Sequence, residues 1–167
     1  MALVPAQRPS SPSTFVILLS WILALGGLGI STYLTIVHFV GTQILACAGN
    51  GAISCEIVTT SAQSRFLGMP VSVLGLSYFV AAVVLYSPWA WWAPWRALHL
   101  IRIAASVVGM CMVLWLITAE LLIIHKICLW CSGVHLITFA LFVITITTAP
   151  AVLARGEDVT DDEVVKV

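Results

Sequence analysis

Residues 127–154 read ICLWCSGVHLITFALFVITITTAPAVLA, an apolar run without Asp, Glu, Lys or Arg that opens with a C-x-x-C pair. A helix needs about 20 predominantly apolar residues to cross the hydrocarbon core of a bilayer. The run therefore predicts a membrane-spanning helix, with Cys128 and Cys131 at its N-terminus. Unpaired N–H groups and the helix dipole favour a thiolate at that position. This stretch thus predicts a membrane helix that begins with a reactive dithiol.

Three more apolar runs precede it, at residues 15–37, 69–86 and 97–124. The first is too long for the core of a cleaved signal peptide, which spans about 7–15 residues. The second is at the short limit for a span, and the third contains Arg102 and Glu120. We therefore predict an all-α integral membrane protein, an antiparallel four-transmembrane-helix bundle.

The composition supports this class. The chain has 167 residues, of which 61% are hydrophobic and only 8% charged, and its mean hydropathy is +1.10. These values exclude an ordinary soluble domain. The formal net charge of zero gives no electrostatic support for binding nucleic acid.

The positively charged residues predict the orientation, because cytoplasmic loops carry an excess of Lys and Arg. A cytoplasmic N-terminus places five of these residues inside (Arg8, Arg96, Arg102, Arg155 and Lys166) and two outside (Arg65 and Lys126). We therefore expect a multi-pass protein of the plasma membrane with both termini cytoplasmic. The paired cysteines then lie on the outer face, where disulfides persist.

Three regions follow along the chain. Residues 1–14 are rich in Pro and Ser and predict a disordered cytoplasmic N-terminus. Residues 15–154 form the predicted membrane catalytic domain, and residues 155–167 an acidic cytoplasmic tail. Within the domain, the outer loop 41–68 is long for a mere connection. Its part 55–66 lacks Gly and Pro, which predicts a short helix at the membrane interface.

The turn between the second and third spans is rich in tryptophan. We expect these side chains to be anchors at the membrane interface, as is typical of tryptophan there. They are Trp89, Trp91, Trp92 and Trp95.

Cys47 and Cys55, with seven residues between them, form a second pair in the outer loop. A disulfide there opposite a C-x-x-C pair makes exchange between the pairs chemically sensible, but a static structural disulfide is an alternative. Zinc bound by the four thiolates with His125 or His135 is another, although the spacing of Cys47 and Cys55 fits a zinc ribbon poorly. We predict no metal.

Below the C-x-x-C pair, His135 lies four residues after Cys131 on the same helix face, and Thr138, Phe139 and Phe142 continue it. A dithiol that faces an apolar pocket needs a lipid-soluble electron acceptor, for which a quinone is the obvious candidate. His135 either donates a hydrogen bond or a proton to that quinone, or it is a packed histidine bonded to a neighbouring helix.

Two further residues have open roles. Glu120, a carboxylate within a predicted span, forms either an ion pair with Lys126 or part of a proton-transfer path. Cys111 lies mid-helix without a partner in sequence, and we expect it to be a small buried hydrophobic residue.

The order of these motifs resembles the vitamin K epoxide reductase family over residues 15–149. The matching features are Cys47-Ala-Gly-Asn-Gly-Ala-Ile-Ser-Cys55, then Ser61, Gly68-Met-Pro70 and Gly75, and Cys128-Leu-Trp-Cys131 at the head of the last helix. A second class of quinone-linked disulfide oxidases has its C-x-x-C in the first outer loop, and the reversed order here argues against it.

The resemblance implies a role for each cysteine. Cys131 would lie nearest the quinone, Cys128 would exchange with Cys55, and Cys47 would meet an outside partner. Ser61 would order the site or bind quinone. We add Phe139 to the expected quinone contacts.

This chain departs from the family's animal members in two places. They carry a tyrosine where this chain has His135. Their quinone-binding asparagine has no evident counterpart, because the second span begins Val71-Ser72-Val73-Leu74.

The predicted function is therefore a quinone-dependent thiol oxidoreductase. It would reoxidise a separate extracytoplasmic thioredoxin-like protein and so support disulfide formation. A first alternative runs the same relay to recycle quinone or quinone epoxide, with reduced quinone as the useful product. A second is a structural membrane protein with static disulfides.

Overall fold

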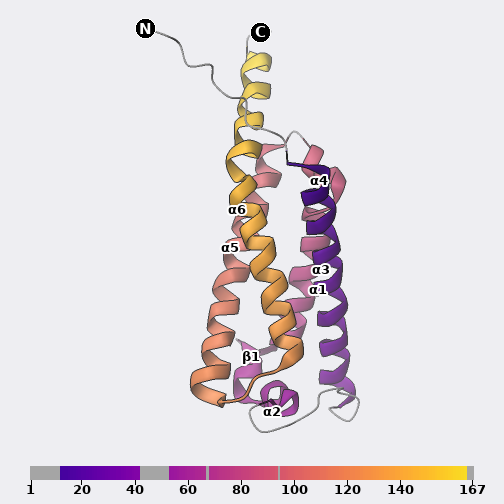
Figure 1. Cartoon of the computed structure of the whole chain (residues 1–167), viewed down its shortest axis with the longest axis vertical. Helices are drawn as coiled ribbons and strands as arrows, with labels where there is room; N and C mark the ends of the chain where they lie inside the picture. The colour runs from indigo at the N-terminus through magenta and orange to yellow at the C-terminus, as the bar shows by residue number, and fades with distance from the viewer. Residues whose placement is uncertain (1–11, 42–52, 67, 94, 165–167) are drawn as a thin grey trace.

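The computed structural model describes residues 12–41, 53–66, 68–93 and 95–164, with side chains described through Leu153. Long helices lie side by side along one axis (Figure 1). They are α1 (Thr14–Val40), α3 (Val71–Leu85), α5 (Arg96–Thr118) and α6 (Leu129–Val164). Short elements connect the long helices. Between α1 and α3 lie α2 (Cys55–Thr60), a 3-10 turn η2 (Ala62–Ser64) and strands β1 (Arg65–Phe66) and β2 (Met69–Pro70), and between α3 and α5 lies α4 (Pro88–Trp92). A π-helical turn, η3 (Ala119–Ile124), continues α5.

Within the bundle, α1 packs against α3 and α6, and α5 packs against α6. The short elements lie at opposite ends (Figure 1). We call the end with α2, β1 and the start of α6 the cysteine end, and the other the α4 end. The antiparallel pair β1–β2 joins the loop to the start of α3, with Phe66 opposite Met69.

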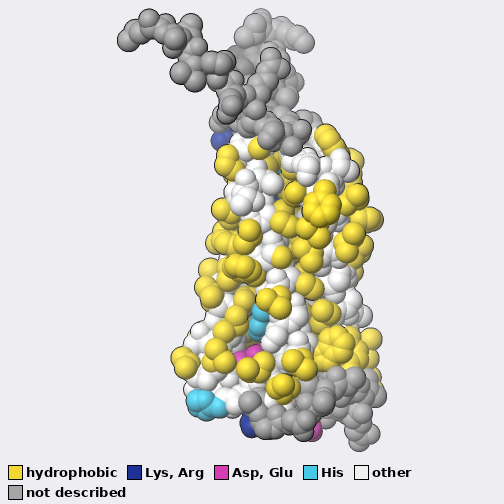
Figure 2. All heavy atoms as spheres, in the orientation of Figure 1, with side chains coloured by type: hydrophobic (Ala, Val, Ile, Leu, Met, Phe, Trp, Pro, Cys, Tyr) yellow, Lys and Arg dark blue, Asp and Glu magenta, His cyan; other side chains and the backbone are white. Residues whose placement is uncertain are grey.

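The chain is an all-α membrane protein, as predicted. Within the described ranges, three helical segments are long and apolar enough to cross a bilayer: Thr14–Val40, Arg96–Ile124 and Leu129–Leu153. The predicted run 69–86 yields the shorter apolar helix α3, because residues 69–70 form β2 and Tyr86 caps the helix. Hydrophobic side chains cover much of the visible surface of the bundle (Figure 2), as expected where the solvent is lipid.

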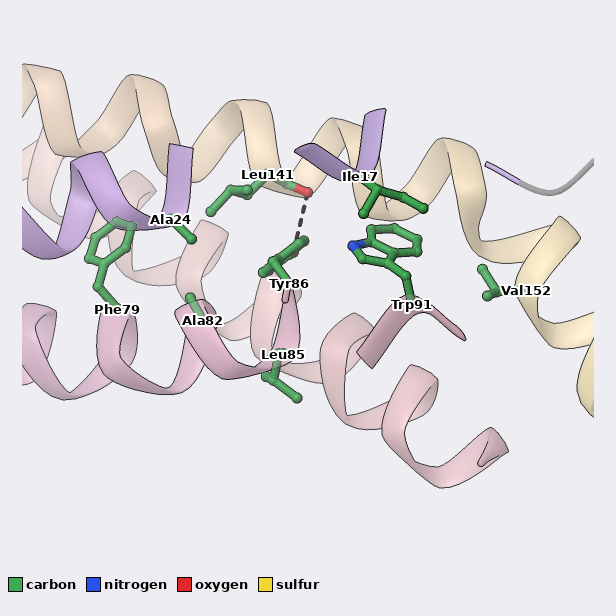
Figure 3. Close-up of a cluster of buried hydrophobic side chains, with 9 residues drawn as sticks. All are labelled: Ile17, Ala24, Phe79, Ala82, Leu85, Tyr86, Trp91, Leu141 and Val152. Carbon is green, nitrogen blue, oxygen red and sulfur yellow. Dashed lines mark hydrogen bonds between the residues drawn. The ribbon is translucent and has the colours of Figure 1, made fainter. Parts of the chain in front are cut away.

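A buried hydrophobic cluster fills the bundle toward the α4 end. Figure 3 shows its members, with the hydrogen bond of 3.4 Å from the Tyr86 hydroxyl to the Leu141 carbonyl. Close packing of α1 on α3 depends on Gly27, since a Cβ there would lie 2.0 Å from the ring of Phe79. Small residues commonly let membrane helices approach this closely. The members of the cluster are Ile17, Ala24, Phe79, Ala82, Leu85, Tyr86, Trp91, Leu141 and Val152.

The prediction that Trp91 is an interfacial anchor is wrong. Its side chain is 1% exposed, whereas Trp89, Trp92 and Trp95 are exposed. The reason is Arg102, whose guanidinium lies 3.9 Å from the centroid of a Trp91 ring. A cation stacks favourably on an indole face, and this contact draws Trp91 inward.

Arg102 is itself buried, at 2% exposure. It donates to the Leu85 carbonyl through Nε (2.9 Å) and Nη2 (2.6 Å), and to the Ala90 carbonyl at 3.0 Å. Its Nη1 lies 3.2 Å from His99 Nδ1. The side chain therefore satisfies carbonyl groups at the end of α3 and within α4, which would otherwise be costly to bury.

Several boundaries differ from the sequence prediction. The helix predicted within 55–66 ends at Thr60, and the chain continues as η2 and β1. The predicted tail 155–167 is helical through Val164, as the last part of α6. Residues 1–11, most of the N-terminus predicted to be disordered, and 42–52 of the outer loop lie outside the described residues.

Candidate active site

Cys128 caps the N-terminus of α6. Its carbonyl accepts from the Ser132 N–H at 2.9 Å, and its sulfur accepts from the Cys131 N–H at 3.4 Å. An N-cap side chain typically accepts from the N–H three residues on. The C-x-x-C spacing supplies this geometry, with sulfur in the place of the usual oxygen.

The capping position changes the acidity of Cys128. A hydrogen bond from the Cys131 thiol, together with the N–H groups of Cys131 and Trp130, lowers the pKa of Cys128 below its ordinary value. Burial and the nearby Glu120 act in the opposite direction but do not prevail. Cys128 and Cys131 are both free thiols. Because the thiolate is the nucleophile in disulfide exchange, Cys128 is the more reactive sulfur of the two.

The loop cysteine Cys55 lies against this dithiol. It is the first residue of α2, is 1% exposed, and belongs to one buried cluster with Val58 and Cys128. Cys55 is disulfide-bonded, while Cys47 lies outside the described residues. The structure thus brings together a disulfide sulfur from the loop and the C-x-x-C dithiol, as the exchange hypothesis requires.

A backbone contact holds the two segments together. Ile53 and Ile127 form a parallel β-bridge, and the Ser54 N–H donates to the Ile127 carbonyl at 3.1 Å. The residues just before Cys55 therefore run beside those just before Cys128.

A cavity of about 420 Å³ opens beside the dithiol, lined by residues of α1, α2, α3, α5 and α6 and of the connecting segments. Most of its lining is apolar. Cys131 is in the lining, whereas Cys128 is not. Figure 2 shows acidic and histidine atoms among hydrophobic side chains in the lower half of the molecule, toward the cysteine end. Polar lining residues include Ser31, His38, Ser61, Ser72, Glu120, His135 and Thr138.

Glu120 contacts the dithiol directly. Its carboxylate accepts hydrogen bonds from the Cys128 N–H and from the Cys131 thiol, and the residue is only 6% exposed. Glu120 lies on η3. The turn after η3 contains His125 in the left-handed backbone conformation (φ 54°), and the Lys126 N–H donates to the Glu120 carbonyl at 3.2 Å.

The residues expected to contact quinone differ in placement. His135 is buried and lines the cavity, and within the described part of the chain no hydrogen bond engages its ring. Ser61 also lines the cavity and donates its hydroxyl to the Val58 carbonyl at 2.8 Å. Phe139 is 50% exposed and is not among the lining residues, because it follows Thr138 around the helix onto the outer face. We therefore leave Phe139 out of the proposed site.

Ser72 is a site residue that sequence reasoning missed. It lies in the first turn of α3 and lines the cavity, and its buried hydroxyl has no hydrogen-bond partner among the described residues. A buried hydroxyl is normally hydrogen-bonded, so an unpaired one beside a cavity is available to a bound molecule. The only signal in the sequence was a serine inside an apolar run.

Cys111 does not match its prediction. It is exposed on the surface of α5 rather than buried. No group of three or more His, Cys, Asp or Glu residues that could hold a metal ion occurs in the part of the chain that the structure describes.

The fold and the site together define a helical membrane protein with a capped dithiol beside an apolar cavity. A model of the vitamin K epoxide reductase family matches residues 18–146, and the chain therefore belongs to that family. In general terms, its members are quinone-linked thiol oxidoreductases. A search of curated proteins found no match.

Proposed function

We propose that this protein oxidises an extracytoplasmic thioredoxin-like partner and passes the electrons to a membrane quinone. The observation that carries the proposal is the contact between pairs: disulfide-bonded Cys55 is buried against the thiol of Cys128, and Cys131 lines an apolar cavity. The described cysteines of the relay thus lie in one cluster, with Cys55 beside Cys128.

The relay needs two exchange steps. A reduced partner opens the loop disulfide, which we assign to Cys47 and Cys55, and leaves both as thiols. The Cys55 thiolate then attacks Cys128 of a Cys128–Cys131 disulfide, which forms a Cys55–Cys128 bond and releases the Cys131 thiolate. Attack of Cys47 on Cys55 restores the loop disulfide and releases Cys128 as a thiolate, and the lowered pKa of Cys128 makes it a good leaving group.

The reduced C-x-x-C pair then gives two electrons to the quinone as its disulfide re-forms, and the quinone takes up two protons. The cavity fits such a substrate because its walls are mostly apolar and a few polar groups face it, the usual character of a small-molecule site. Ser61 and His135 are the proposed quinone contacts, and the unpaired hydroxyl of Ser72 is a further donor at the start of α3.

We also propose the arrangement in the membrane. α3 would be a fourth, short span, α2 would lie at the outer interface, and both termini would be cytoplasmic. The sequence-based count of five positive residues on the cytoplasmic side and two on the outer side favours this orientation. It places the cysteine end in the oxidising compartment, where a loop disulfide persists.

Complementation tests the proposal. The gene is expressed in a bacterial strain that lacks its own quinone-linked disulfide oxidase, and disulfide formation in a secreted reporter is measured. Wild type should restore oxidation, while Cys55→Ala and Cys128→Ala should not. Restored disulfide formation with both cysteine variants would contradict the relay. If the purified protein reduces quinone but does not restore disulfide formation in the cells, quinone recycling is the favoured function.

A further inference from the structure

We propose that Glu120 is the proton acceptor of the C-x-x-C dithiol. It takes the thiol proton of Cys131 as the Cys128–Cys131 disulfide forms and gives it to an oxygen of the quinone being reduced. This inference rests on the proposed function and names a residue that acts in its last step.

The thiol of Cys131 has two hydrogen-bond acceptors beside it. It bonds with the sulfur of Cys128 and with the carboxylate of Glu120. A thiol has one proton, so the two acceptors compete for it. When Cys128 gives up its electrons to form the disulfide, its sulfur is no longer an acceptor for that proton, and the carboxylate remains.

A proton taken up by Glu120 stays beside the cavity. Glu120 and Cys131 line the same cavity, and Glu120 is almost fully buried. A proton on the carboxylate is therefore held at the wall where the quinone would bind. His38 and His135 line the cavity as well, but the contact with the dithiol belongs to Glu120.

The backbone supports this placement. Glu120 lies on the π-helical turn η3, which packs against α2. π-Helical turns often occur at functional sites. The Cys128 N–H donates to the same carboxylate, so the start of α6 and the carboxylate are held together.

The S–S bond forms between Cys128 and Cys131, and the electron pair passes to the quinone, which becomes a hydroquinone. One of its two protons comes from Cys131 through Glu120, and the other comes from water on the outer side. Glu120 ends as a carboxylate, ready for the next turnover.

The test separates the two halves of the reaction. Glu120→Gln keeps an oxygen that can accept both hydrogen bonds but cannot take up a proton. The protein in lipid nanodiscs is first reduced with dithiothreitol, and free thiols are counted against time. The reduced protein, freed of reductant, is then mixed with ubiquinone-1, and quinol formation is followed in a stopped-flow spectrometer.

Glu120→Gln should be reduced by dithiothreitol at the wild-type rate. Its quinol formation should be slower by about tenfold or more, because general acid–base catalysis typically contributes about 10²–10⁴-fold. Glu120→Asp should recover part of the loss. Glu56→Gln, the same chemical change at an exposed position on α2 that does not line the cavity, is the matched control. It should behave as wild type in both steps.

Quinol formation by Glu120→Gln at the wild-type rate would overturn the inference. Equal slowing of both steps in Glu120→Gln and Glu120→Asp would overturn it too, since that pattern belongs to a residue that only positions the helix. If Glu120→Gln does not fold, the test rests on Glu120→Asp. Slower quinol formation with an unchanged rate of reduction by dithiothreitol supports the inference. Failure of wild type to reduce quinone would instead refute the proposed function.

Discussion

Cys55 and Cys128 are buried against each other, at 1% and 0% exposure, although α2 and the cap of α6 are far apart in sequence. Neither sulfur can meet a protein from outside in this arrangement. Under the proposed function, contact with a partner would therefore fall to Cys47, and the two buried sulfurs would serve the internal transfer.

Replacing Cys131 by Ala should abolish quinone reduction with any reductant, because no disulfide can then form at the cavity. Replacing Cys47 should abolish turnover with a protein partner but leave some activity with dithiothreitol, which is small enough to reach the inner dithiol. Quinol formation with each reductant measures both effects. Cys111→Ala, at an exposed position on α5, should match wild type. Normal quinone reduction by Cys131→Ala would refute the relay.

The buried contact also predicts an intermediate that can be trapped. In Cys131→Ser, Cys128 loses its intramolecular partner, and its thiolate should attack the disulfide-bonded Cys55 beside it. A stable Cys55–Cys128 disulfide should accumulate, which peptide mapping under non-reducing conditions would detect. Cys128→Ser is the control and should not form it. A map in which Cys55 never links to α6 would exclude this route.

His135 should act in quinone reduction only. Its ring lines the cavity one turn below Cys131, so His135→Phe removes the ring nitrogens that could donate to a quinone while it keeps the bulk of the side chain. We expect slower quinol formation with unchanged reduction by dithiothreitol, and substantial recovery in His135→Tyr, because a phenol can donate in its place. Equal quinol rates for all three proteins would mean that the histidine is only packed.

Arg102 should matter for stability and not for catalysis. Arg102→Met leaves the Leu85 and Ala90 carbonyls without their donor, and each buried unsatisfied group costs about 1–3 kcal/mol. The thermal unfolding midpoint in detergent should fall, while quinone reduction well below that midpoint should be retained, because the residue lies at the α4 end. Arg96→Met, at an exposed position on the same helix, is the matched control. An unchanged midpoint in Arg102→Met would contradict the buried network.

Local sequence patterns predicted the structural features that depend on residues close together in the sequence. Apolar length predicted the long helices, and the C-x-x-C spacing predicted a dithiol at the start of α6. The spacing worked because capping joins Cys128 to a residue only three positions later. The family resemblance added the exchange between Cys55 and Cys128, which no local pattern contains.

Contacts between distant segments were not predictable in this way. Trp91 was assigned to the membrane interface because its neighbours are tryptophans, yet Arg102 on the next helix holds it inside. Cys111 was expected to be buried, but its side chain lies on the outer face of α5. The bonds of Glu120 to the dithiol depend on a π-helical turn, which hydrophobic periodicity does not indicate.

The bridge between Ile53 and Ile127 has a kinetic consequence. It consists of backbone contacts and does not depend on any bond between sulfurs. It holds the two cysteine segments side by side in the state with Cys55 disulfide-bonded and Cys128 and Cys131 as free thiols. Exchange between linked groups proceeds at a high effective concentration, so collision between the segments does not set the pace. The rate of turnover should therefore depend on the ionisation of the thiols. The viscosity of the medium should have little effect on the exchange between the two cysteine segments.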